Sequence, residues 1–100
     1  MLGLVLALAT GAAPAPVAQD RASVVCLVTP LFVWPSGEAL PHRAGAAGNA
    51  RIGETFPVYS GPRVSLEGYR LYELDMPVAE SGYGPNERYW IEQDCVSISH

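Results

Sequence analysis

The chain has 100 residues, of which 49% are apolar and 16% are charged, and its formal net charge is −4. This length predicts one small domain, and the large apolar fraction argues against a disordered polar chain. Its six basic residues are all Arg, without Lys and without a basic cluster. Such a chain is a poor partner for nucleic-acid phosphates or for an anionic membrane surface, so we expect neither.

Residues 1–18 have the composition of an export leader. An unbroken run of apolar and small residues, Leu2–Ala9, is followed by the small-residue stretch TGAAPAPVA. The run matches the apolar region of a signal peptide and is far shorter than the roughly 20 residues of a membrane span. We therefore predict a secreted, periplasmic or cell-envelope protein, cleaved after Ala18 or Ala12, whose domain covers residues 19–100. No basic residue precedes the run, and an uncleaved hydrophobic anchor is the alternative.

The two cysteines, Cys26 and Cys95, lie near the two ends of the predicted domain. In an exported protein an even number of cysteines indicates a disulfide, and a domain this small gains much from one. Two free buried thiols in a cytosolic protein are the alternative. The cysteines and the two histidines do not have the spacing of metal ligands, so we expect neither a metal nor a cofactor.

Short extended segments separated by Gly and Pro predict an all-β domain. The density of Gly and Pro from Pro30 to Pro85 excludes a long helix. A long loop of small residues is expected over Pro35–Gly48. The predicted strands, in chain order, are Ser23–Val28 (buried), Leu31–Trp34, Asn49–Tyr59 with a bulge or kink at Gly53, Tyr69–Leu74, Arg88–Glu92 and Cys95–Ile98.

Alternation within these segments predicts which side chains share a face. Tyr69 and Leu71 fall on one face of their strand, and Tyr72 and Leu74 on the other. In Asn49–Tyr59 the expected apolar positions are Ile52, Phe56 and Val58.

The second half resembles the bacterial SH3-like (SH3b) domain family. The residues that carry the resemblance are Gly48–Tyr59 (GNARIGETFPVY), Tyr69–Leu74 (YRLYEL), Tyr89–Ile91 (YWI) and Cys95–Val96. The resemblance implies a small SH3-like barrel of five to six short strands over residues 19–100. The first and last strands of such a barrel lie close together, and a Cys26–Cys95 bridge fits that arrangement.

The sequence offers little for catalysis. A nucleophile needs a base and an orienting group within reach. Histidine is the usual catalytic base at neutral pH, and the chain has two, His42 in the long loop and His100, the last residue. We therefore predict that the protein is not an enzyme.

The aromatic residues are the strongest binding candidates. Exposed aromatic side chains beside long loops hold extended peptides in SH3-type grooves. The candidate ligand-binding residues are Trp34, Tyr59, Tyr72 and Tyr83. In the alternative structural interpretation, Trp34 caps the barrel and Tyr83 packs back on its own turn.

Two functions follow as expectations. The first is a small exported SH3-like binding module that recognises a peptide or a peptidoglycan-type cell-wall polymer at the cell envelope. The second is a secreted inhibitor or accessory subunit that binds a partner enzyme through the Pro35–Gly48 loop, in which Glu38, His42 and Arg43 stand between small residues.

Overall fold

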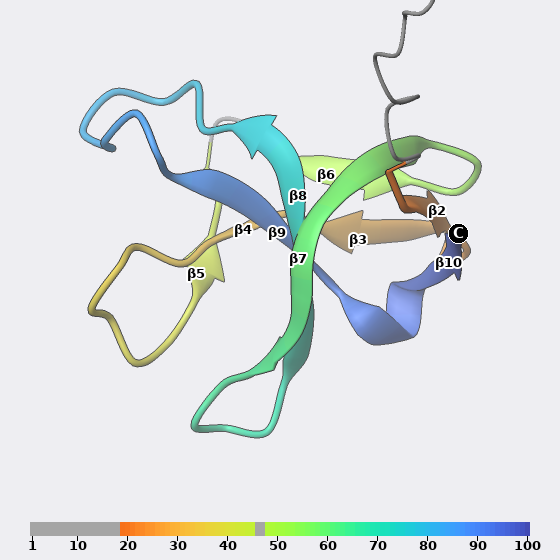
Figure 1. Ribbon diagram of the computed structural model, residues 1–100, viewed down its shortest axis with the longest axis horizontal. Helices are drawn as coiled ribbons and strands as arrows, with labels where there is room; N and C mark the ends of the chain where they lie inside the picture. The colour runs from red at the N-terminus through yellow and green to blue at the C-terminus, as the bar shows by residue number, and fades with distance from the viewer. Residues whose placement is uncertain (1–18, 46–47) are drawn as a thin grey trace, which may run out of the picture.

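The protein is all-β in the computed structural model, which describes residues 19–45 and 48–100 (Figure 1). The predicted leader, residues 1–18, lies outside the described residues. The strands are β2 (Arg21–Val24), β3 (Val28–Pro30), β4 (Phe32–Val33), β5 (His42–Arg43), β6 (Asn49–Arg51), β7 (Thr55–Val64), β8 (Arg70–Pro77), β9 (Arg88–Glu92) and β10 (Val96–Ser99), with one 3₁₀ turn, η1 (Gln93–Cys95), before the last strand.

Seven strands form one antiparallel sheet in the order β10-β2-β7-β8-β9-β4-β5, and β3 pairs with β6 in a separate ribbon. Figure 1 shows β7 arching across the molecule. It pairs with β2 near its start and with β8 along the rest of its length. Within the described residues the edge strands β10 and β5 do not pair with each other, so the sheet does not close into a barrel. The expectation of five to six strands was too low. Strand β3 begins at the last residue of the predicted strand Ser23–Val28, β5 forms within the predicted loop, and the predicted strand Asn49–Tyr59 is divided between β6 and β7.

The first and last described strands lie side by side. Strands β2 and β10 pair antiparallel, with Val24 opposite Val96 and Arg21 opposite Ser99. A disulfide joins Cys26 to Cys95 just beyond this pairing, across a Cα–Cα distance of 5.0 Å and 69 positions of sequence. The predicted disulfide is therefore confirmed, and it closes almost the whole domain into one covalent loop.

The segment Ser23–Val28 is not one buried strand. The chain leaves β2 after Val24, turns at the disulfide and begins β3 at Val28. Val25 is 52% exposed and Leu27 is 80% exposed. The bridge draws Cys26 toward η1, and the neighbouring side chains are left outside the core.

The segment Asn49–Tyr59 is likewise divided, by a tight turn between β6 and β7. Gly53 occupies this turn with φ +89°, a conformation that favours glycine. The turn is closed by Arg51, whose backbone N–H donates to Glu54 Oε1 and whose carbonyl accepts from the Glu54 N–H at 3.1 Å. Ile52 is exposed at the corner rather than facing the core.

Strand β7 bends where it crosses β8. Its register with β8 shifts between Val58 and Ser60 and again between Ser60 and Arg63. At Gly61, with φ +116°, an added Cβ would lie 3.2 Å from backbone atoms of Leu71 and Tyr72. Only glycine fits so close an approach in this conformation, and the bend carries β7 from β2 to β8.

The two faces of the sheet are covered differently. The main core contains the buried residues Ala22, Val24, Leu31, Val33, Ala44, Ala50, Leu74, Tyr89 and Ile91. A second, smaller cluster of Trp34, Leu71 and Trp90, with Phe32 packed against it, lies on the opposite face. Leu71 and Leu74 thus face opposite sides of β8, as the alternation predicted. No helix in the described residues has the length and apolar content to cross a membrane.

Candidate functional site

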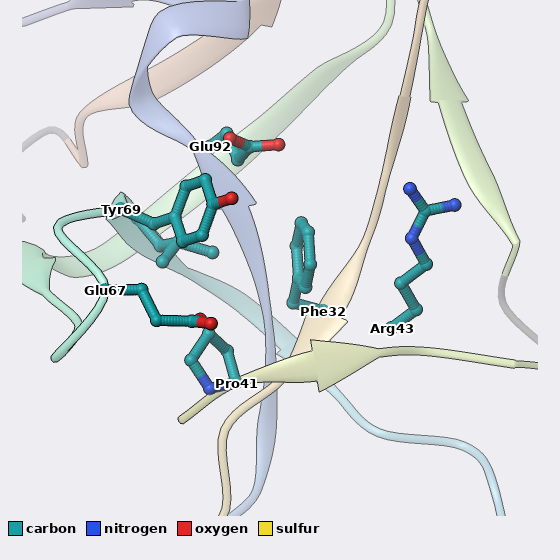
Figure 2. Close-up of a pocket in the computed structure, with 7 residues that line it drawn as sticks. Phe32, Pro41, Arg43, Glu67, Tyr69 and Glu92 are labelled. Carbon is teal, nitrogen blue, oxygen red and sulfur yellow. The ribbon is translucent and has the colours of Figure 1, made fainter. Parts of the chain in front are cut away.

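A pocket of about 260 Å³ opens on the face that carries the second cluster. It lies between the β4–β5 hairpin, the β7–β8 turn and β9. In Figure 2, Phe32 stands between Tyr69 and Arg43, and Glu67 extends toward Pro41. The lining residues are Phe32, Pro41, Arg43, Glu67, Tyr69, Leu71 and Glu92.

The strand register brings these side chains to one face. Phe32 of β4 lies opposite Arg43 of β5 and opposite Trp90 of β9. Glu92, two residues along β9 from Trp90, lies opposite Leu71 of β8. Residues directly opposite each other, and residues two apart on one strand, project to the same face of a sheet. The pocket is therefore a product of pairing between strands that are far apart in sequence.

The second cluster adjoins the pocket, because Phe32 and Leu71 belong to both. The Trp34 and Trp90 rings lie with centroids 5.0 Å apart at an interplanar angle of 60°. The Trp34 indole N–H donates to the Glu38 carbonyl at 3.0 Å, and the Arg63 guanidinium carbon lies 4.0 Å from the Trp34 ring centroid. Hydrogen bonding and cation–π contact thus fix Trp34 in the cluster that packs against Phe32 and Leu71, two of the lining residues.

The β7–β8 turn is organised by one buried serine. Ser65 Oγ accepts from the backbone N–H of Glu67 at 3.3 Å and of Tyr69 at 3.2 Å. The Ser65 backbone bonds Tyr69 and Gly68 as well, at 2.8 and 3.0 Å. A serine hydroxyl that bonds its own turn in this way holds the following residues in place. Ser65 therefore positions the Glu67 and Tyr69 side chains at the pocket rim.

The charged groups at the rim are unpaired within residues 19–45 and 48–100. Arg43, Glu67 and Glu92 take part in none of the ion pairs there. Tyr69 adds a ring that is 53% exposed. One cation, two carboxylates and two aromatic rings can bind a ligand that has apolar groups and charges of both signs.

The four aromatic residues expected to bind ligand do not lie on one surface. Trp34 is only 3% exposed, packs in the second cluster and does not line the pocket. Tyr72 faces the opposite side of β8, and Tyr72 and Tyr83 both pack against the main core. Tyr59 is 53% exposed, with the Arg88 guanidinium carbon 3.6 Å from its ring centroid.

Sequence reasoning missed most of the pocket. No local pattern marks Phe32, Pro41, Glu67 or Glu92 as binding residues. Arg43 is expected to bind only as part of the loop Pro35–Gly48, in contact with a partner enzyme. The usable signal was the Tyr69–Leu71 alternation, which placed two lining residues on one face. The remaining members depend on the register of β4 and β5, which no local pattern encodes.

The described residues contain no group of three or more His, Cys, Asp and Glu side chains with the arrangement of a metal site. Comparison with known proteins adds no identification. No protein-family model matches the chain, and neither curated proteins nor solved structures include a significant match.

Proposed function

We propose that this protein is a small exported, SH3-like binding module that holds a peptide, or the peptide part of a cell-wall polymer, in the pocket between β4–β5, the β7–β8 turn and β9. The observation that carries the proposal is the pocket itself. Its aromatic and apolar walls and its unpaired charged rim suit an extended chain that offers side chains and charges together.

Three further features support an exported SH3-like module. Residues 1–18 have the composition of a leader. The Cys26–Cys95 disulfide is compatible with an oxidising compartment. The side-by-side placement of β2 and β10 agrees with the resemblance of the sequence to SH3b domains. An oxidising cell envelope is where peptide-bearing wall polymers are met.

Two tyrosines provide the test of the pocket. Tyr69 and Tyr59 are both 53% exposed, but only Tyr69 lines the pocket. We expect Tyr69→Ala to weaken binding to purified peptidoglycan, or to its soluble stem peptides, by about tenfold, and Tyr59→Ala to leave it unchanged. The measurements are a pull-down on peptidoglycan and a titration followed by NMR chemical shifts.

The matched pair also separates the pocket from a surface centred on Tyr59. Equal binding by wild type and Tyr69→Ala would overturn the pocket assignment. Loss of binding in Tyr59→Ala alone would place the ligand over Tyr59 and Arg88 instead. Circular dichroism of both variants checks that each keeps the fold.

A second function, inhibition or support of a partner enzyme, is favoured by the contacts that hold the long loop in one conformation. Glu38 accepts the Trp34 indole hydrogen bond through its carbonyl and pairs with His42 Nε2 through Oε1 at 3.3 Å. Leu40, between them, is exposed. A preformed loop loses little entropy on binding a partner, which is the advantage that such inhibitors exploit.

Leu40 is the residue that distinguishes this second function, because it does not line the pocket. Under the partner hypothesis, Leu40→Asp abolishes co-purification of an enzyme from the secreted fraction and leaves peptidoglycan binding intact. Unchanged co-purification would exclude the loop as the contact.

A further inference from the structure

The two edges of the seven-stranded sheet differ in how they are protected. Strand β5, at one edge, is two residues long, is exposed and carries Arg43. Strand β10, at the other edge, is four residues long with the sequence VSIS, and it contains neither a charge nor a proline (Figure 1). Natural proteins blunt free edges with short strands, charges, prolines or bulges. Strand β10 has no charged residue, no proline and no bulge.

The pairing of β10 with β2 fixes which of its backbone groups are already used. Ser97 lies opposite Ser23, and the Val25 N–H donates to the Cys95 carbonyl at 2.8 Å. The N–H and C=O groups of successive residues in a strand point to opposite sides. The Cys95 carbonyl and the backbone of Ser97 therefore face β2, and the residues that alternate with them face away.

The outward-facing backbone groups of β10 belong to Val96 and Ile98. The same alternation makes the backbone N–H of His100, just after the strand, face outward too. The Val96 N–H already donates to the Gln93 carbonyl at the end of η1. The Val96 carbonyl, both backbone groups of Ile98 and the His100 N–H remain on the open edge of the described sheet. Such a row of unused groups is a template for another strand.

We propose that this edge pairs antiparallel with β10 of a second copy of the chain, about a two-fold axis at Ile98. In this register the Ile98 N–H of each copy donates to the Ile98 carbonyl of the other. The Val96 carbonyl of each accepts from the His100 N–H of the other. Every outward group named above gains a partner, and the Val96 N–H needs none. The contact is isologous, as two-fold dimers require.

The side chains also favour a second copy as the occupant. Each chain has a net charge of −4, but Val96–Ser99 carry no charged side chain, so these four positions bring no like charges together. Ser97 of one copy lies opposite Ser99 of the other on the exposed face. On the other face Ile98, which packs against the main core, meets its own counterpart and extends the apolar surface.

The test uses the exposed serines. We expect sedimentation velocity of the full chain to show a concentration-dependent dimer. The double variants S97K/S99K and S97E/S99E place like charges opposite each other across the axis, and should raise the dimer dissociation constant by about tenfold or more. The matched variant S97E/S99K places opposite charges there and should retain the dimer.

Hydrogen exchange gives a second readout. The Ile98 amide should become protected as chain concentration rises in the wild type, and not in S97K/S99K. A chain that stays monomeric up to millimolar concentration overturns the proposal. So does a dimer whose dissociation constant is the same in S97K/S99K and in S97E/S99K.

Discussion

The pocket face of the sheet has two regions that differ in whether their charged side chains form ion pairs. In one region Arg88 lies 3.7 Å from both Glu73 and Asp75 and stacks on Tyr59, and Ser60 Oγ donates to Glu73 Oε1 at 2.7 Å. In the pocket region the rim charges are unpaired among the described residues. The first region is satisfied within the fold, and the second is available for a ligand.

Under the proposed function, this contrast separates the residues that stabilise the domain from those that bind ligand. Glu73 and Trp90 are cross-strand neighbours, so the two regions share β8 and β9. The paired region has Arg88 of β9, and Tyr59 and Ser60 of β7, around Glu73. Arg43 of β5 and Glu92 of β9 have no ion-pair partner among the described residues. Substitutions in the paired region should change stability, and substitutions in the pocket rim should change binding.

Removing the disulfide provides the largest effect and a baseline for this comparison. The double variant Cys26→Ser with Cys95→Ser opens a loop of 69 positions. We expect the free energy of unfolding to fall by about 4 kcal/mol at most, as loop-closure entropy allows. Urea denaturation measures the loss.

Neither cysteine lines the pocket, so ligand affinity of the folded fraction should not change. A large change in the ligand dissociation constant at a temperature where the variant is still folded would show that the two ends of the sheet are coupled.

Ser65→Ala should give an intermediate effect on both quantities. It removes the acceptor of the Glu67 and Tyr69 amides, and a lost buried acceptor costs about 1–3 kcal/mol. Because these amides belong to the pocket rim, ligand affinity should fall as well. Thermal denaturation and the NMR titration report the two effects, and Ser65→Thr, which keeps the hydroxyl, is the control.

The smallest effects come from a matched pair of arginines. Arg88→Met should lower the free energy of unfolding by about 1 kcal/mol, since partly exposed ion pairs and cation–π contacts contribute little, and should leave ligand binding unchanged. Arg43→Met should leave stability within about 0.5 kcal/mol and weaken binding of a ligand that carries a carboxylate. Weaker binding in Arg88→Met, or a large loss of stability in Arg43→Met, would contradict the division into a stabilising region and a binding region.

The sequence predicted the class of fold because local patterns carry it. Strand β9 has the predicted bounds, Arg88–Glu92, and the alternation in Tyr69–Leu74 correctly separated Leu71 from Leu74. The disulfide followed from the number of cysteines. The strand patterns depend on neighbouring residues in the sequence. The disulfide has one possible pairing, because the chain has two cysteines.

The features that were missed depend on contacts between distant segments. The run of apolar residues in Ser23–Val28 is typical of a buried strand. Because Cys26 is bonded to Cys95, the chain turns there, and the Leu27 side chain is exposed to solvent. Trp34 looks exposed beside Pro35, but the Glu38 carbonyl and the Arg63 side chain enclose it. The pocket could not be foreseen because its walls meet only through the β4–β5 and β4–β9 registers.

The position of the disulfide also has a mechanical consequence. Tension applied between residues 19 and 100 would act first on the β2–β10 pairing, which separates from the Arg21–Ser99 end. Peeling would stop at Cys26–Cys95 after a few residues, because the bond carries the load from there. The residues that line the pocket all lie between the two cysteines, outside the covalent path from residue 19 to residue 100. Stretching the domain by these two ends would therefore leave the pocket folded.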